Sequence, residues 1–195
     1  MGPEPRFVAG ERFQDALAYA AVAHAHQARK GKDTPYIAHP LGVCALVLEA
    51  GGDEDQAIAA LLHDTAEDQG GRDRLLDIEN RFGPRVAGIV ESMSDTLEQP
   101  KPPWRERKEA HLAHLERASA DVLLVAVADK LHNAHSINND LRADGEEHWS
   151  RFNGGKDGTI GYFRKLAALF TRRLPGPLTD EYLRAVDEMR MLTAG

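Results

Sequence analysis

Apolar residues recur every three or four positions along most of the chain, the period of an α-helix with one buried face. The first such segment covers residues 13–28, and Gly31 and Pro35 end it. The other segments with this period cover residues 41–50, 54–67, 72–82, 84–93, 105–117, 120–136, 159–173 and 179–192. No alternating, strand-like pattern is longer than four residues. The sequence therefore predicts an all-α fold of about nine or ten helices.

Two of these segments contain runs that are apolar on nearly every helical face, residues 57–62 and 122–127. A helix of that kind is buried. The first run ends in Leu-Leu-His63-Asp64-Thr-Ala-Glu67-Asp68, and the second in Ala-Asp129-Lys-Leu-His-Asn133. On one continuous helix over residues 54–67, His63 would lie above Glu67 and Asp64 above Asp68, because residues four apart share a face. We expect both helices to carry their polar ends from the core towards a cavity.

A third polar position lies before another apolar helix. His39 precedes Pro40, which is tolerated at a helix start, so His39 would lie at the entry to the helix over residues 41–50. Imidazole and carboxylate groups without thiolate form a ligand set for divalent first-row metals. Two imidazoles and two carboxylates could thus be offered to one ion by His39, His63, Asp64 and Asp129. The alternative for the segment at residues 61–68 is a solvated helix end with a chance histidine.

Length and charge narrow the class of protein. A chain of 195 residues fits one domain, here predicted over residues 1–195 with a leader at 1–12 and a packed C-terminal helix within 174–195. The 31 acidic and 24 basic residues give a net charge of −7, which argues against nonspecific nucleic-acid binding. The single cysteine, Cys44, excludes an internal disulfide framework and suggests a buried thiol in a reducing compartment. Without a signal peptide or an apolar run approaching about 20 residues, we expect a cytoplasmic protein with no membrane partner.

The order His39, His63-Asp64, Asp129 resembles the HD-domain metal-dependent phosphohydrolases, an all-α superfamily. The flanking residues are similar to the hydrolase domain of the RelA/SpoT family, and the similarity extends from about Phe13 to Arg173. Four ordered motifs carry it: Arg29-Lys30-Gly-Lys-Asp-Thr-Pro-Tyr-Ile-Ala-His39-Pro, His63-Asp64-Thr-Ala-Glu67-Asp68, Glu106-Arg107-Lys108 and Ala128-Asp129-Lys130-Leu-His-Asn133. Because no synthetase or regulatory region follows, the chain looks like a stand-alone small alarmone hydrolase.

This resemblance implies removal of the 3′-diphosphate from ppGpp or pppGpp, the alarmones of the stringent response, releasing pyrophosphate and GDP or GTP. It implies Mn²⁺ as the cofactor, bound with positions left for water and substrate. Glu67 would orient or deprotonate the metal-bound water, with help from Asp68. The family assigns the position of Asn133, one turn beyond Asp129, to catalysis or phosphate positioning. The expected partner is this small nucleotide, without nucleic acid, and a homo-oligomer is compatible with the sequence.

The resemblance also assigns residues to the nucleotide. Arg29 and Lys30 would hold the guanine, with the planar guanidinium stacked on the base; the alternative is a cationic last turn that complements a helix dipole. Further substrate contacts are expected from Ser136, Lys156 and Tyr162. The chain departs from the family at Trp104, where a lysine is common, and the lost phosphate contact would fall to Arg105, Arg107 or Lys108.

Two other functions remain open at this stage. The same site could hydrolyse a related nucleotide, either the adenosine alarmone or the 2′-phosphate of NADPH, since the basic segment would serve either base. A protein of another class would be a catalytically silent nucleotide-binding module. The intact set of Glu67, Asp68 and Asn133 argues against that alternative.

Overall fold

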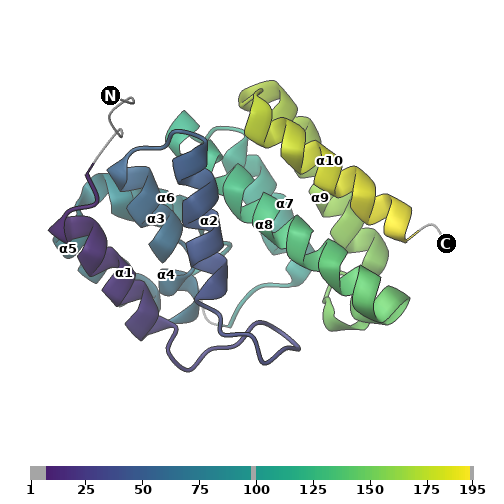
Figure 1. Cartoon of the computed structure of the whole chain (residues 1–195), viewed down its shortest axis with the longest axis horizontal. Helices are drawn as coiled ribbons and strands as arrows, with labels where there is room; N and C mark the ends of the chain where they lie inside the picture. Colours follow the sequence, from purple (N-terminus) through teal and green to yellow (C-terminus); the bar gives the residue numbers. More distant parts are fainter. Residues whose placement is uncertain (1–7, 98–99, 194–195) are drawn as a thin grey trace, which may run out of the picture. The chain divides into compact units, whose positions relative to one another are not determined.

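Helices make up nearly all of the regular secondary structure, as the apolar periodicity predicts. The computed structural model describes residues 8–97 and 100–193, and this part of the chain contains ten α-helices, one 3-10 helix and an isolated β-bridge between Ala28 and Pro35 (Figure 1). The prediction of an all-α fold is confirmed. The chain forms two compact units, Met1–Glu98 and Gln99–Gly195, which are described in turn. The prediction of a single domain stays a prediction.

Unit 1 is built around one short buried helix. Its helices are α1 (Glu11–Ala23), α2 (Ala38–Glu49), α3 (Glu54–Leu62), α4 (Thr65–Asp68), α5 (Gly71–Phe82) and α6 (Pro84–Met93). Helix α3 packs against α1, α2 and α6, and every residue from Gln56 to Leu62 is buried. This burial is what the all-apolar run at residues 57–62 predicts. Helix α3 therefore holds the segment that follows it, beginning at His63, in a fixed place within the unit.

A capping box begins α3. The Asp53 carboxylate accepts a hydrogen bond from the Gln56 amide at 3.0 Å, and the Gln56 side chain accepts one from the Asp53 amide at 2.8 Å. Burial alone would raise the pKa of Asp53, but hydrogen bonds from Arg85 and from the Gln56 amide outweigh it and hold that pKa below its usual value of 3.8. The charged carboxylate therefore stabilises the folded state.

We expect Asp53→Ala to lower the free energy of unfolding by about 1 kcal/mol at neutral pH, the usual contribution of an N-cap. Because the pKa is lowered on folding, this contribution is complete above the unfolded pKa and is lost as the pH falls through the folded pKa. Urea unfolding of the variant and the wild type at neutral pH and near pH 3 measures the difference. An undiminished difference at the lower pH would contradict the assignment to the ionised carboxylate.

Two predicted helices are shorter than expected. Helix α1 ends at Ala23 and not at Ala28, so the residues before Gly31 belong to a hairpin. The predicted helix over residues 54–67 is interrupted, with α3 ending at Leu62 and α4 beginning at Thr65. Side chains compete for the carbonyls there, since His63 Nδ1 bonds to Ala60 O at 2.8 Å and Thr65 Oγ1 donates to Leu62 O at 2.6 Å. The single continuous helix predicted over residues 54–67 is therefore wrong, but the Asp68 amide donates to Asp64 O at 3.0 Å, so these two residues still lie one helical turn apart.

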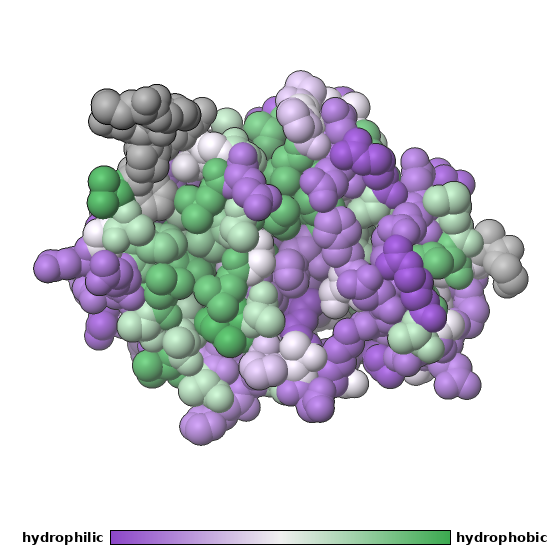
Figure 2. All heavy atoms as spheres, in the orientation of Figure 1, coloured by the Kyte–Doolittle hydropathy of each residue, from purple (hydrophilic) through white to green (hydrophobic). Residues whose placement is uncertain are grey.

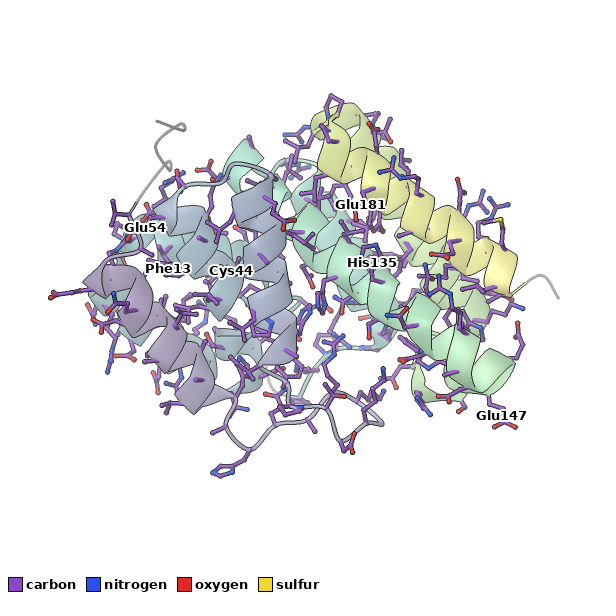
Figure 3. The ribbon with its side chains drawn as sticks, viewed as in Figure 1. Phe13, Cys44, Glu54, His135, Glu147 and Glu181 are labelled. Atoms are coloured by element: carbon purple, nitrogen blue, oxygen red, sulfur yellow. The ribbon has the colours of Figure 1, made fainter. Side chains whose placement is uncertain are left out.

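Unit 2 is organised by a long helix. It contains α7 (Trp104–Leu115), α8 (Ala120–Asp144), the 3-10 helix η1 (Gly145–Arg151), α9 (Gly155–Arg173) and α10 (Pro177–Leu192). Helix α8, whose N-cap Ser119 accepts a hydrogen bond from the Val122 amide, packs against α9, α10 and η1. Figure 3 shows His135 of α8 facing Glu181 of α10, with 3.7 Å between Nε2 and Oε1. The predicted C-terminal helix thus packs onto the unit along α8 (Figure 1).

Cys44 on α2 is a buried free thiol, as the sequence predicts (Figure 3). Burial raises its pKa to about 11, so the thiol stays protonated at neutral pH.

Figure 2 shows a largely apolar surface over α1 and α2, helices on which Val22, Leu41 and Leu48 are exposed. Within residues 8–97 and 100–193, no helix has the length and apolar character required to span a membrane.

Candidate metal and nucleotide site

Three predicted metal ligands of unit 1 converge. His39 lies in the first turn of α2, His63 directly follows α3, and Asp64 directly precedes α4. The two histidine Nε2 atoms are 3.2 Å apart, and Asp64 Oδ2 lies 3.1 Å from His63 Nε2 and 3.5 Å from His39 Nε2. Both histidines are buried at 1% exposure. Segments more than twenty residues apart in sequence are therefore brought to one point by the packing of α2 on α3.

The tautomer of His63 suits a metal ligand. Its Nδ1 lies 2.8 Å from the carbonyl oxygen of Ala60, which can only accept, so Nδ1 carries the proton and Nε2 presents a lone pair. A backbone carbonyl that orients a ligating imidazole in this way is a regular feature of metal sites. The side-chain bond that helps to end α3 thus also fixes the ring that faces His39 and Asp64.

Tyr36 holds the third ligand. Its hydroxyl donates to Asp64 Oδ2 at 2.5 Å, and its ring meets the His39 ring edge-on, with 5.8 Å between centroids. Burial, followed by the charge of the neighbouring Asp64 carboxylate, raises the pKa of the Tyr36 phenol far above its usual value. The phenol therefore remains a proton donor to that carboxylate at neutral pH.

The donor set fits a divalent cation. Ligand atoms bound to one ion at about 2.1 Å lie about 3.0 Å apart at right angles and about 3.4 Å apart in a tetrahedron. The three separations among the ligand atoms of His39, His63 and Asp64 are 3.1, 3.2 and 3.5 Å. Two neutral imidazoles and one carboxylate leave coordination positions for other ligands. This agrees with the predicted site for a divalent metal.

The remaining predicted ligand, Asp129, belongs to unit 2. It lies on α8 directly after the buried residues 125–128 and is itself 3% exposed. The Asn133 amide donates to Asp129 Oδ1 at 2.6 Å, and Lys130 Nζ lies 2.7 Å from Oδ2. Asn133, one helical turn further on, therefore orients the Asp129 carboxylate within α8.

Comparisons with known proteins identify the family. The model of the HD domain matches residues 16–158. The chain belongs to the HD domain family. The prediction of an enzyme of the HD-domain hydrolase class, made from the order His39, His63-Asp64 and Asp129, is thereby confirmed.

Three proteins similar in sequence are named for their enzymatic activities. A guanosine-3′,5′-bis(diphosphate) 3′-pyrophosphohydrolase, MESH1 of Xenopus tropicalis, is 41% identical over 139 residues, 70% of this chain and 73% of its own length. The Homo sapiens protein of that name is 39% identical over 128 residues, 64% of this chain and 68% of its length. The bifunctional (p)ppGpp synthase/hydrolase SpoT of Escherichia coli is 34% identical over 140 residues, covering 69% of this chain but 19% of SpoT.

A solved structure has the same fold. It comes from a study of a metazoan orthologue of SpoT that hydrolyses ppGpp, and its TM-score with this chain is 0.76 at 28% identity. The match covers 98% of this chain and 99% of that one. The resemblance to RelA/SpoT homologues is confirmed.

Within this HD domain, the two predicted catalytic carboxylates follow the ligand pair on α4. Glu67 Oε2 accepts a hydrogen bond from the Asp95 amide at 2.8 Å, and Asp68 Oδ2 accepts one from Gln27 Nε2 at 2.8 Å. Each carboxylate is therefore oriented by a segment distant in sequence. Sequence reasoning found the carboxylates but assigned no role to Gln27, Tyr36 or Asp95. Tyr36 lies within the first of the four motifs, whereas Gln27 and Asp95 lie outside all of them.

The predicted base-binding residues lie on a short hairpin of residues 27–36, which we call the basic hairpin. Ala28 bridges Pro35, and the Arg29 amide donates to Thr34 O at 2.9 Å. The Arg29 guanidinium carbon lies 5.6 Å from the centroid of the Tyr36 ring. Since α1 ends at Ala23, the alternative of a cationic last helical turn is wrong for Arg29 and Lys30.

A cavity of about 190 Å³ lies in unit 2 between α7 and α9. Its wall includes Trp104, Lys108 and Tyr162; Lys108 Nζ is 5.1 Å from the Tyr162 ring centroid, and the Trp104 ring lies edge-on to it at 6.4 Å. Gly154 permits this packing, since a Cβ there would lie 2.7 Å from the indole. Trp104 thus forms an apolar wall of the cavity, and Lys108 supplies a cation one turn further on.

The other two predicted substrate contacts lie on α8 and α9. Lys156 Nζ pairs with Glu146 Oε1 at 2.7 Å and donates to Thr193 O at 2.7 Å, so it ties η1 to the end of α10. Ser136 is partly exposed on α8, three residues beyond Asn133. Their roles towards a phosphate stay predictions.

Proposed function

We propose that this protein hydrolyses the 3′-diphosphate of ppGpp and pppGpp, releasing pyrophosphate and GDP or GTP, with Mn²⁺ as its cofactor. The convergence of His39, His63 and Asp64 in an HD domain carries the proposal. The similar proteins named as 3′-pyrophosphohydrolases support the substrate.

We assign four ligands to the cation: His39, His63, Asp64 and Asp129. The motif order of the family and the buried, hydrogen-bonded Asp129 carboxylate support the fourth. Mixed imidazole and carboxylate ligation without sulfur suits manganese. When bound, such a cation would lower the pKa of a coordinated water and polarise the phosphoryl group whose phosphorus is attacked.

In this proposal Glu67 and Asp68 orient the attacking water and accept its proton. Two hydrogen-bonded carboxylates next to the ligand pair can orient a water and accept its proton. The bond from the Asp95 amide fixes one Glu67 oxygen, and a carboxylate has enough lone pairs to accept further hydrogen bonds. Asn133 holds the Asp129 carboxylate and faces the phosphate.

The nucleotide is held at two places. Arg29 and Lys30 of the basic hairpin contact the purine, for which the planar guanidinium of Arg29 is suited. Tyr162, Lys108, Ser136 and Lys156 of unit 2 contact the ribose and phosphates. The cavity beside Tyr162, lined by an aromatic ring and an ammonium group, supports this assignment.

We expect Lys108→Met to raise the KM for ppGpp about tenfold with little change in kcat, because it removes a cation that binds the phosphates equally before and during the reaction. Arg184→Met on α10 is the matched control, since Arg184 is exposed and does not line the cavity. Steady-state kinetics on the two variants measures the difference. An equal KM for Lys108→Met and the wild type would remove Lys108 from the substrate site.

The deciding experiment is turnover of ppGpp by the purified chain. Pyrophosphate should appear in equal amount to GDP, disappear after treatment with a chelator and return on addition of Mn²⁺. Release of inorganic phosphate alone, or turnover that the chelator leaves unchanged, would contradict the proposal. Parallel assays with pppApp and NADPH identify the preferred nucleotide, and binding of ppGpp without turnover of any of the three would indicate a silent nucleotide-binding module.

A further inference from the structure

The neck of the basic hairpin is joined to two carboxylates of the segment His63–Asp68. Gln27 and Tyr36 face each other across the neck, where the Tyr36 amide donates to Gln27 O at 2.9 Å. The Tyr36 hydroxyl donates to Asp64 Oδ2 at 2.5 Å, and Gln27 Nε2 donates to Asp68 Oδ2 at 2.8 Å. One rung of a hairpin thus supplies a neutral donor to each of the two aspartates.

We propose that Gln27 and Tyr36 are positioning residues, Tyr36 for the Asp64 carboxylate towards the cation and Gln27 for the Asp68 carboxylate towards the attacking water. The inference rests on the proposed function for the roles of Asp64 and Asp68. Both donors are uncharged, so they fix a carboxylate oxygen while leaving the group anionic.

The Tyr36 ring is held by neighbours of the same unit. It packs against His24 at 4.9 Å between centroids and edge-on against His39 at 5.8 Å, and the Arg29 guanidinium lies over it. With the ring fixed in this way, the hydroxyl has one direction in which to donate, towards Asp64. Tyr36 therefore contacts two proposed ligands and a proposed base-binding residue at once.

The side-chain oxygen of Gln27 determines which way its NH₂ group points. Its Oε1 lies 2.7 Å from His24 Nδ1 and accepts from Gln69 Nε2 at 3.3 Å. Because Oε1 is an acceptor in both contacts, the NH₂ group must face Asp68. His24 is 2% exposed, so the chain of contacts from His24 through Gln27 to Asp68 begins in the core and ends at the exposed Asp68 carboxylate. A side chain anchored in this way holds its partner in place more effectively than a mobile surface amide.

Tyr36→Phe tests the proposed role of Tyr36, because phenylalanine keeps the ring and its packing and removes only the hydroxyl. We expect the dissociation constant for Mn²⁺, measured by electron paramagnetic resonance of free Mn²⁺, to rise about tenfold, the usual loss for an outer partner of a metal ligand. At saturating Mn²⁺ the kcat should return towards the wild-type value. Tyr19→Phe is the matched control, since the Tyr19 hydroxyl donates to Asp77 Oδ2 at 2.7 Å elsewhere in unit 1.

Gln27→Leu and Gln27→Glu test the proposed role of Gln27. We expect each to lower kcat about tenfold while KM and the Mn²⁺ dissociation constant stay within about twofold of the wild type. Glutamate keeps the length of the side chain but replaces the donor with an oxygen. If kcat falls as much in Gln27→Glu as in Gln27→Leu, or further, the loss comes from the missing hydrogen bond and not from missing packing. Gln14→Leu on α1 is the control, because the Gln14 amide bonds only at the exposed Ala9 carbonyl among the contacts described.

Unchanged Mn²⁺ affinity in Tyr36→Phe, or a loss no larger than in Tyr19→Phe, would overturn the role of Tyr36. A wild-type kcat in both Gln27 variants would overturn the role of Gln27. The Mn²⁺ measurement needs no nucleotide. A weakened Mn²⁺ affinity in Tyr36→Phe, found together with a wild type that does not release pyrophosphate from ppGpp, would therefore reject the proposed function and support the Tyr36 assignment.

Discussion

Asp64→Ala is expected to lower kcat/KM for ppGpp by at least about 10³-fold, roughly 4 kcal/mol of transition-state stabilisation. Asp64 Oδ2 is an anionic atom that lies 3.5 Å from His39 Nε2 and 3.1 Å from His63 Nε2. Its removal leaves two neutral imidazoles and only one of the two proposed carboxylate ligands, Asp129, so Mn²⁺ should no longer bind at concentrations that saturate the wild type. Titration with Mn²⁺ and turnover of ppGpp measure the two effects.

The control for this variant is Asp73→Ala, which removes an exposed carboxylate from the first turn of α5. It should bind Mn²⁺ and turn over ppGpp like the wild type. The chelated wild type should match Asp64→Ala in residual rate. Full turnover by Asp64→Ala would show that the convergence of His39, His63 and Asp64 is not the active site.

Glu67→Gln is expected to lower kcat by about 10²- to 10⁴-fold, the usual contribution of a general base. The glutamine oxygen can still accept the bond from the Asp95 amide, which Glu67 Oε2 accepts at 2.8 Å, so the segment should keep its geometry. Only the capacity to take a proton is lost. The Mn²⁺ dissociation constant should not change, which separates this variant from Asp64→Ala.

Glu79→Gln, at an exposed position of α5, is the matched control for the same chemical change. Its kcat should equal that of the wild type. A Glu67→Gln variant with wild-type kcat, or one that fails to bind Mn²⁺, would show that Glu67 does not act on the water. In the first case Asp68→Asn becomes the variant to measure.

The sequence predicts burial wherever apolar residues cover every face of a helix. The run at 57–62 is buried throughout in α3, and the run at 122–127 is buried in α8 except at the partly exposed Leu124, because their composition leaves almost no polar face for solvent. The end of α3 at Leu62 could not be predicted from the sequence. A helix over residues 54–67 satisfies the periodicity equally well, and the hydrogen bonds from His63 and Thr65 that end it depend on side-chain conformation.

The cavity between α7 and α9 was also not foreseen. The sequence shows a tryptophan at position 104, but the role of Trp104 as an apolar wall depends on the absence of a side chain at Gly154 and on the Tyr162 ring. Glycines at positions 154, 155 and 158, in the five residues before the helix predicted over 159–173, are the available signal. They indicate close approach of another group without identifying it.

The sequence by itself determined the helical class, the buried helices and the chemical types of the site: two histidines and acidic residues at the ends of apolar runs. These properties follow from residue identity and local period. Only the tertiary structure decided which atoms meet. The Nε2 atoms of His39 and His63 come together across 24 residues, Tyr36 reaches Asp64 across 28, and Gln27 reaches Asp68 across 41. Such contacts depend on the packing of α2 on α3 and on the course of the basic hairpin, which no local pattern encodes.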